Sequence, residues 1–428
     1  MVIRLEKIKI NIIILGIVAA ILMRYTPTNK MYYLYMLILT ILLGLKTITY
    51  HNLEINKSNL HRMIFIITSM LYIYFLSIDN MVFVTKRYLI IFILMLYLYL
   101  SFSKYGIKYA EKFYKQLTII LNVFSVVNLY QIIFQKPFLL KYMDLMEVGY
   151  NYKFGTSGYR TMSVFNHPIV SGLFFIIAFL CNMYIVKNKN LKYVLQILLI
   201  LNIYTSKARS AWITFAIIIF ILIFNNRKKI LIKISKPKLT YRKVIIAIVF
   251  LIFGFLFAIF YLPDIFSSII ERFGDSLKVN STSGSNLQRT MTIKLILNHM
   301  FNGDPIRLIF GYGGGTVSDF MILNPVLLEG FTTTDNQYLS LFYEFGLVGV
   351  IFYITLFLNI TKKYLLNKSK HWTITLSYMC FIAINVDLIF FEAWPVILIM
   401  MSFLISILTF KFKNNYVEKN KQLKHITH

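Results

Sequence analysis

Residues 168–186 read PIVSGLFFIIAFLCNMYIV, a stretch that contains no charged side chain. About 20 mostly apolar residues are enough for a helix to cross a bilayer. Working outward from this stretch, we find eleven more, so the sequence predicts an all-α, polytopic membrane protein with about 12 transmembrane helices. The predicted spans are residues 10–23, 31–45, 63–78, 88–103, 116–134, 168–186, 193–205, 210–225, 244–262, 338–360, 372–387 and 395–410.

The composition supports this prediction and excludes several classes of protein. Of the 428 residues, 58% are hydrophobic and 14% are charged, and the mean hydropathy is +0.68. Soluble globular domains carry about 25% charged residues. The values therefore argue against an ordinary soluble enzyme, a disordered chain and a secreted disulfide scaffold. No soluble domain is appended, and we treat residues 1–428 as a single integral membrane domain.

The excess of basic residues, a formal net charge of +28, carries information about topology. Alternate connections, starting with the N-terminal tail, hold 30 of the 45 Lys and Arg residues. Because cytoplasmic loops are enriched in Lys and Arg, both termini are predicted to be cytoplasmic. This orientation makes residues 135–167 a short external loop and residues 263–337 a large external loop. Long loops usually carry function, so we expect the latter to be the catalytic loop, on the outer face of the membrane.

Motifs of nucleotide-driven and metal-driven enzymes are missing from the sequence. It contains no GxxxxGK[ST] loop, no Asp-x-Asp pair, no GxSxG elbow and no HExxH motif. The 7 histidines are scattered and show no metal-ligand spacing. We therefore predict a protein without a metal site or a soluble cofactor, and with no nucleic acid among its partners.

Two short stretches place basic residues at the predicted external ends of spans. GYRTMSVFNHP (158–168) contains Arg160 and His167, and TSKARSAW (205–212) contains Lys207 and Arg209. An arginine inside a helical bundle costs about 2.5–3.5 kcal/mol on insertion scales and needs a partner. An arginine at the end of a span can instead extend its charge into water. These residues are either contacts for an anionic substrate or ordinary interfacial charges.

A helix of about four turns is predicted inside the long external loop. Ser285 and Gln288 fit a capping box, and apolar residues recur at Met291, Ile293, Leu295 and Ile296. Arg289 falls in the predicted first turn, where free backbone N–H groups favour anions. A cation is unfavourable there unless an anion binds. The functional interpretation is an anion site, and the alternative is a solvated helix charge.

Glycines and carboxylates flank the predicted span at 338–360. The glycines of GYGGG (311–315) permit close approach of the backbone. A carboxylate within the membrane is a functional candidate by default, and one at its edge can accept a proton. The candidate residues in this region are Tyr312, Gly313, Asp335, Asn336, Tyr338 and Glu344.

From about residue 155 to 365, the order of these stretches resembles the O-antigen ligase/polymerase family, the Wzy-type integral membrane glycosyltransferases of bacterial polysaccharide assembly. The resemblance implies a GT-C-like fold in the bacterial cytoplasmic membrane. It also implies a metal-independent, inverting transfer from an undecaprenyl-pyrophosphate-linked donor. The family's two pyrophosphate-binding arginines match Arg209 and Arg289. In the ligase branch a histidine precedes the conserved asparagine. Here that position is Asp335, which favours the polymerase branch.

The predicted reaction joins lipid-linked repeat units into a polysaccharide. Arg209 and Arg289 would stabilise the charge that develops on the leaving pyrophosphate. Asp335 is the first candidate for the base and Glu344 the second. The predicted substrate-binding residues are Arg160, His167, Lys207, Tyr312, Gly313, Asn336 and Tyr338.

The predicted partners are an undecaprenyl-pyrophosphate-linked oligosaccharide and the lipid bilayer, with a flippase and a chain-length regulator as candidate protein partners. Two other functions stay open at this point. One is a ligase that transfers finished O-antigen or polymer to another acceptor, and the other is a flippase for lipid-linked oligosaccharides. The product class, whether capsule, O-antigen, exopolysaccharide or a teichuronic-type polymer, is also open.

Overall fold

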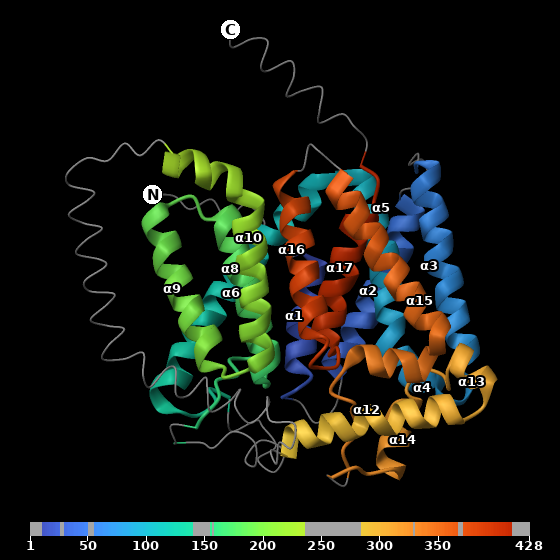
Figure 1. The fold of residues 1–428 in the computed structure, drawn as a ribbon. Coiled ribbons are helices and arrows are strands. Elements are labelled where there is room, and N and C mark those ends of the chain that lie inside the picture. The colour runs from blue at the N-terminus through green and yellow to red at the C-terminus, as the bar shows by residue number, and fades with distance from the viewer. Residues whose placement is uncertain are drawn as a thin grey trace, which may run out of the picture.

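The computed structural model describes residues 11–25, 30–49, 55–139, 155, 158–235, 284–327, 330–366 and 371–412. Every regular element in these ranges is a helix, and the long helices stand side by side in one bundle (Figure 1). This confirms the all-α prediction. The bundle comprises α1 (Ile12–Leu22), α2 (Lys30–Thr49), α3 (Lys57–Leu76), α5 (Ile90–Tyr105), α6 (Ile107–Phe134), α8 (Pro168–Ile185), α9 (Lys189–Thr205), α10 (Arg209–Ser235), α15 (Gln337–Leu366), α16 (Trp372–Asp387) and α17 (Pro395–Thr409).

Six described helices are long and apolar enough to cross a membrane. They are Lys30–Thr49, Lys57–Leu76, Arg87–Tyr105, Ile107–Phe134, Pro168–Ile185 and Gln337–Leu366. The protein is therefore a multi-pass membrane protein. Eleven of the predicted spans coincide with described helices, but several of these are short, and the predicted span at 244–262 lies outside the described residues. The count of 12 transmembrane helices stays a prediction.

Helix α8 is surrounded by other helices of the bundle. In its 18-residue apolar window, 83% of the residues are buried, because the sequence is apolar on every face of the helix. Pro168 occupies the first turn, where its fixed φ suits a helix and its missing N–H costs nothing. Helices α6, α9, α10 and α16 pack around it. The first residues of α8 therefore enter the bundle at a defined place.

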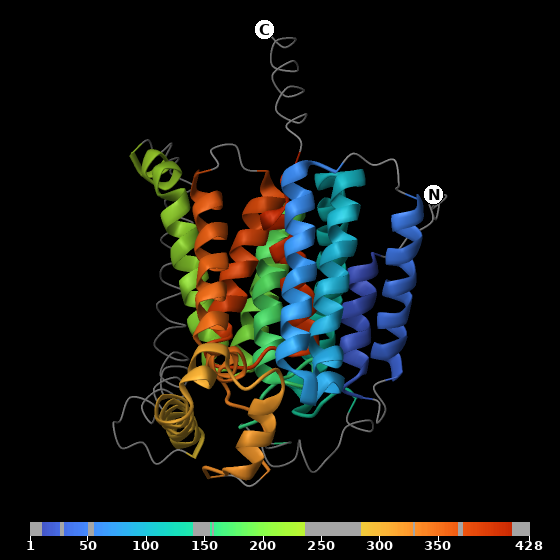
Figure 2. The ribbon, with the colours of Figure 1, turned by 90° about the vertical axis from the view of Figure 1, so that its right-hand side faces the viewer.

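The described part of the predicted long external loop, residues 284–327 and 330–337, folds against one end of the bundle, and residues 263–283 of the prediction lie outside the described residues. Within it, α12 (Gly284–Asn302), α13 (Pro305–Phe310) and α14 (Thr316–Leu323) lie together, and α12 runs across the bundle helices (Figures 1 and 2). One stripe of α12 is buried, at Gln288, Thr292, Ile296 and Met300. Ile296 and Met300 belong to a small apolar cluster with residues of α14 and α15.

The start of α12 differs from the prediction by a small shift. The helix begins at Gly284, so Ser285 lies inside the helix rather than capping it. Arg289 consequently falls in the second turn, which corrects the prediction that it lies in the first. Helix ends fray, and a shift of one or two residues is normal. Of the predicted short external loop, residues 135–139, 155 and 158–167 are described.

Candidate active site

The structure joins two of the predicted catalytic residues directly. The Arg289 Nε donates to Asp335 Oδ2 at 3.3 Å, and Arg289 Nη2 donates to the carbonyl of Phe390 at 3.4 Å. The side chains of Arg289 and Asp335 are 27% and 25% exposed. The pair thus joins α12 to the segment before α15 and to the connection between α16 and α17, and it stays open to solvent or substrate.

The position of Asp335 is fixed by its backbone conformation and by the hydrogen bonds of neighbouring residues. Its φ of +54° lies in the left-handed region, which Asp tolerates better than most residues. The preceding residue, Thr334, donates its backbone N–H to Glu392 Oε1 at 2.9 Å. Burial raises the pKa of Asp335 above its ordinary value, and the guanidinium of Arg289 opposes this shift. A carboxylate whose pKa is raised toward neutrality is better suited to accept a proton.

His167 lies near three arginines, one of which is Arg289. The ring stacks on Phe391 with centroids 4.6 Å apart, and its Nδ1 accepts from the Ile169 N–H as the N-cap of α8. Burial lowers the pKa of His167 well below its usual range, and the nearby guanidinium groups of Arg160, Arg24 and Arg289 lower it further. The imidazole is therefore neutral and leaves the charge of the three arginines in place. This arrangement favours the binding of an anion.

Arg160 and its neighbour Thr161 contact the turn between α9 and α10. Arg160 Nε donates to the carbonyl of Ser206 at 3.4 Å, and the Thr161 N–H donates to the Thr205 carbonyl at 3.1 Å. Lys207, in this turn, has a φ of +49°, and Arg209 is the first residue of α10. The predicted residues Arg160, Lys207 and Arg209 therefore lie on neighbouring segments at the same end of the bundle as α12 (Figure 1).

The glycine-rich stretch forms a loop that packs on a kink in α15. The kink is at Gly346, whose φ of +61° and ψ of −160° are open to glycine alone. The N–H groups of Tyr312 and Gly313 donate to the carbonyls of Tyr343 and Glu344, at 3.0 and 2.8 Å. Gly313 therefore serves close packing, since a Cβ there would lie 2.5 Å from a backbone oxygen of Leu76.

Glu344, the second predicted base, is buried inside this packing. Its Oε1 accepts from the Gly315 N–H at 2.8 Å, and its Oε2 accepts from the Tyr88 hydroxyl at 2.7 Å. Tyr312, the predicted aromatic contact, stacks on Tyr343 at 4.9 Å. These contacts favour a structural role for Glu344, and they leave Asp335 as the better placed base.

Asn336 and Tyr338 begin the helix that follows. Asn336 Oδ1 accepts from the N–H groups of Tyr338 and Leu339, at 2.9 and 3.1 Å, and thus caps α15. The Tyr338 hydroxyl donates to the Asn385 carbonyl at 2.8 Å, which ties α15 to α16. Both residues hold the segment that carries Asp335, and their predicted contact with substrate stays a prediction.

Part of the chain is similar to a known protein family. Residues 194–354 match the O-Antigen ligase family. The resemblance inferred from the motifs is thereby confirmed. The matched segment contains Arg209, Arg289, Asp335 and Glu344. No curated protein matches the chain. The family match indicates a glycosyltransferase-like membrane enzyme, and it gives no support to the flippase alternative.

Several residues at the site lie outside the O-Antigen ligase segment, and sequence reasoning missed them. Arg24, after α1, places its guanidinium 3.8 Å from the centre of the Trp394 ring. Glu392 supports Thr334 and lies 3.7 Å from Arg87 Nη2. Each of these contacts joins residues far apart in the chain, so local spacing gave no signal.

Buried polar side-chain atoms without hydrogen-bond partners occur in several described helices, some of them at this end of the bundle. Among the described residues they include both side-chain amide atoms of Gln288 and the Thr292 hydroxyl, on the buried stripe of α12. They also include both carboxylate oxygens of Asp387, which faces Ser210 without a well-formed hydrogen bond. Buried polar groups normally find a partner, so Gln288 and Thr292, next to Arg289, are candidates to bind a polar substrate.

Within the described residues, no group of three or more His, Cys, Asp or Glu side chains is placed to hold a metal ion. Metal independence, like the inverting stereochemistry, stays a prediction.

Proposed function

We propose that the protein is a polysaccharide polymerase, which transfers a polyprenyl-pyrophosphate-linked glycan onto the next lipid-linked repeat unit. The observation that carries the proposal is the Arg289–Asp335 pair, at 3.3 Å, beside the neutral His167 and its neighbouring arginines. The arginines can stabilise the negative charge of a leaving group, and the Asp335 carboxylate can accept a proton.

The donor's pyrophosphate would bind to the arginines. Negative charge builds on the bridging phosphate oxygen as the sugar–oxygen bond breaks, and fixed cations stabilise it. Arg289 and Arg209 are proposed to supply the main contacts, with Arg160 in support. A charge-assisted hydrogen bond contributes about 1.5–3 kcal/mol. The planar fork of Arg also matches two phosphate oxygens at once, which Lys cannot do.

The acceptor would be activated by Asp335. As the acceptor oxygen attacks the anomeric carbon, its proton passes to the Asp335 carboxylate, and the bonding electrons of the sugar–oxygen bond leave with the pyrophosphate. In the structure Arg289 holds Asp335, and an arriving pyrophosphate would compete for that guanidinium. Release from Arg289 makes the carboxylate more basic, because it loses the cation that opposes its raised pKa.

Gln288 and Thr292 are proposed to bind sugar hydroxyl groups. They lie one helical turn apart on the buried stripe of α12, and Gln288 directly precedes Arg289. Their buried polar atoms have no partner among the described residues. A glycan hydroxyl both donates and accepts, so it can satisfy an amide and a hydroxyl together.

A ligase is the second candidate, because the matched family is described as O-Antigen ligase. The two reactions share a donor and differ in the acceptor. The polymerase is preferred because a carboxylate, Asp335, occupies the position of the histidine in the ligase branch. The proposed location is the outer face of the bacterial cytoplasmic membrane, with both termini cytoplasmic.

The size profile of lipid-linked glycans tests the proposal. The strains compared would lack the gene, or carry the wild-type protein, Arg289→Ala, or the control Arg307→Ala, which changes an exposed arginine of the same loop. Single repeat units that accumulate, with polymer lost both without the gene and with Arg289→Ala, are expected for a polymerase. Long polymer retained on the carrier would replace the polymerase by the ligase. Repeat units trapped on the cytoplasmic side would overturn both.

A further inference from the structure

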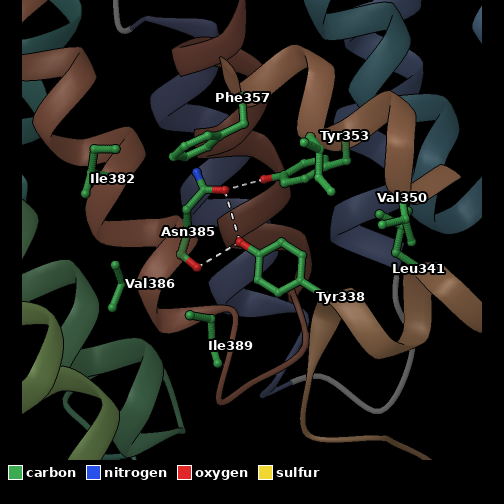
Figure 3. A pocket seen from close by; sticks show the side chains of 10 residues that line it. Tyr338, Leu341, Val350, Tyr353, Phe357, Ile382, Asn385, Val386 and Ile389 are labelled. Carbon is green, nitrogen blue, oxygen red and sulfur yellow. Dashed lines mark hydrogen bonds between the residues drawn. The ribbon is translucent and has the colours of Figure 1, made fainter. Parts of the chain in front are cut away.

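A pocket of about 440 Å³ lies between α15 and α16 (Figure 3). This volume falls within the usual range of small-molecule sites, about 300–1,000 Å³. Its wall is apolar apart from Tyr338, Tyr353 and Asn385. The lining side chains come from both sides of the Gly346 kink in α15, so the bend of this helix helps to open the space.

The polar groups of the pocket already bond to one another. The Tyr353 hydroxyl donates to Asn385 Oδ1, and the Tyr338 hydroxyl shares its proton between Asn385 Oδ1 and the Asn385 carbonyl (Figure 3). The Asn385 Nδ2 donates to the Phe381 carbonyl at 2.6 Å. Little hydrogen-bonding capacity remains for a polar ligand. The remaining wall, which includes Ile354 and Ile389, suits a hydrocarbon chain.

The pocket is lined by residues that adjoin the candidate active site in the chain. Tyr338 follows Asp335 by three residues. Ile389 directly precedes Phe390, whose carbonyl accepts from Arg289 Nη2. Ile354 and Ile389 are 51% and 46% exposed, so the mouth opens on the outside of the bundle, where lipid chains would lie. A molecule with a charged head at Arg289 and an apolar tail can occupy both places.

We propose that this pocket holds the first isoprene units of the polyprenyl chain, next to the pyrophosphate of the donor. The inference rests on the proposed function and adds the site of the lipid tail. A bilayer is as apolar as the pocket, so transfer of the tail into it gains little hydrophobic free energy. The pocket instead orients the pyrophosphate toward Arg289, and misplacement by about 1 Å can cost about a hundredfold in rate.

Photolabelling tests the location. The probe is a polyprenyl pyrophosphate with a diazirine on its second isoprene unit, added to the full-length protein in bilayer nanodiscs, with labelled peptides mapped by mass spectrometry. Labels are expected within residues 338–357 or 382–389. Excess undecaprenyl pyrophosphate should remove them, and excess phosphatidylglycerol should not. Labels elsewhere, or equal competition by phosphatidylglycerol, would overturn the proposal.

A matched pair of variants on α15 supplies the control. Ile354→Trp fills the mouth of the pocket, whereas Ile351→Trp changes a side chain that is 61% exposed and does not line it. Both positions are exposed, so both variants should fold. Ile354→Trp should reduce labelling and glycan transfer by about tenfold, an effect of about 1.4 kcal/mol, and Ile351→Trp should change neither. Equal effects of the two variants would count against the pocket.

The two proposals can fail separately. A wild-type protein that transfers glycan but is labelled outside the pocket removes the lipid-tail site and leaves the transferase in place. A protein labelled in the pocket that transfers no glycan, with repeat units supplied in excess, removes the transferase and keeps the isoprenoid site.

Discussion

Asp335→Asn separates the chemistry of the site from its stability. The substitution keeps the shape of the side chain and removes its ability to take a proton. The Asn oxygen can still accept from Arg289 Nε, which lies 3.3 Å from Asp335 Oδ2. The Asn amide group then replaces Oδ1 and can donate to the Thr333 hydroxyl, whose oxygen lies 3.4 Å away. The backbone conformation at φ +54° suits Asn at least as well as Asp. The local structure should therefore persist.

The expected loss of activity is large. A positioned general base contributes about 10²–10⁴-fold to the rate. Asp335→Asn should lower the transfer rate by that factor, which corresponds to about 3–5 kcal/mol in the activation free energy. The substitution does not remove the guanidinium of Arg289, so binding of the donor should change little.

The expected change in the free energy of unfolding is small. The Arg289–Asp335 pair is about one-quarter exposed, and such pairs stabilise a fold by about 0–1 kcal/mol. Burial raises the pKa of Asp335, so its protonated form favours folding and that contribution is lost as pH rises through the folded-state pKa. At neutral pH the wild-type carboxylate carries the cost of burial. Asp335→Asn, which resembles the protonated form, should therefore be about as stable as wild type, or slightly more so.

Transfer between synthetic lipid-linked repeat units by the purified protein measures the effect. The wild-type rate should rise with pH through the raised pKa of Asp335, and Asp335→Asn should lose this acidic limb. The control is Asp319→Asn, an exposed acid of α14 in the same loop, which should keep both rate and profile. An Asp335→Asn protein that retains more than about a tenth of the activity would refute Asp335 as the base.

Three further predictions use other parts of the site. Arg289→Lys should lower transfer by about ten- to a hundredfold, because one ammonium cannot replace contacts to Asp335, the Phe390 carbonyl and a phosphate; Arg307→Lys is the control in the same assay. Glu344→Gln should lower the free energy of unfolding by about 1–3 kcal/mol in denaturant or thermal titrations, and an inactive variant of wild-type stability would restore Glu344 as a base. Gly346→Ala should cost about 1–3 kcal/mol or prevent folding, because its Cβ would meet a backbone oxygen, whereas Gly44→Ala meets nothing within 4 Å and should be neutral in the same titrations.

The membrane helices were predictable because each is a local property of the chain. A run such as residues 168–186 must form a helix in lipid, where every backbone N–H and C=O needs an internal partner. The structure gives α8 as Pro168–Ile185, within one residue of that prediction. The helix in the long loop was predictable for a similar reason, from its apolar recurrence. The predicted start of α12 was wrong because several neighbouring residues, in the stretch STSGSN (281–286), are of types that can cap a helix.

The pairing of residues within the site was only partly predictable. Arg289 and Asp335 were both selected from local patterns, but the contact between them spans 46 residues and came from the structure. Arg24 and Glu392 had no local pattern to select them. Arg24 contacts Trp394, and Glu392 bonds to Thr334, 58 residues earlier. Such contacts depend on how helix ends meet, which apolar periodicity does not specify.

The different environments of three carboxylates decide how their roles divide. Glu344 is fully buried and uses both oxygens, toward Tyr88 and the Gly315 N–H. Glu392 is also buried, and its oxygens face Thr334, Ser340 and Arg87. Asp335 alone of the three is open to a quarter of its surface, and it shares a cation that an anionic substrate would also bind. Position relative to the membrane selected Asp335 and Glu344 from the sequence, whereas Glu392 came from the structure alone. Exposure and available lone pairs distinguish the proposed base, Asp335, from the other two carboxylates, which bond to neighbouring segments.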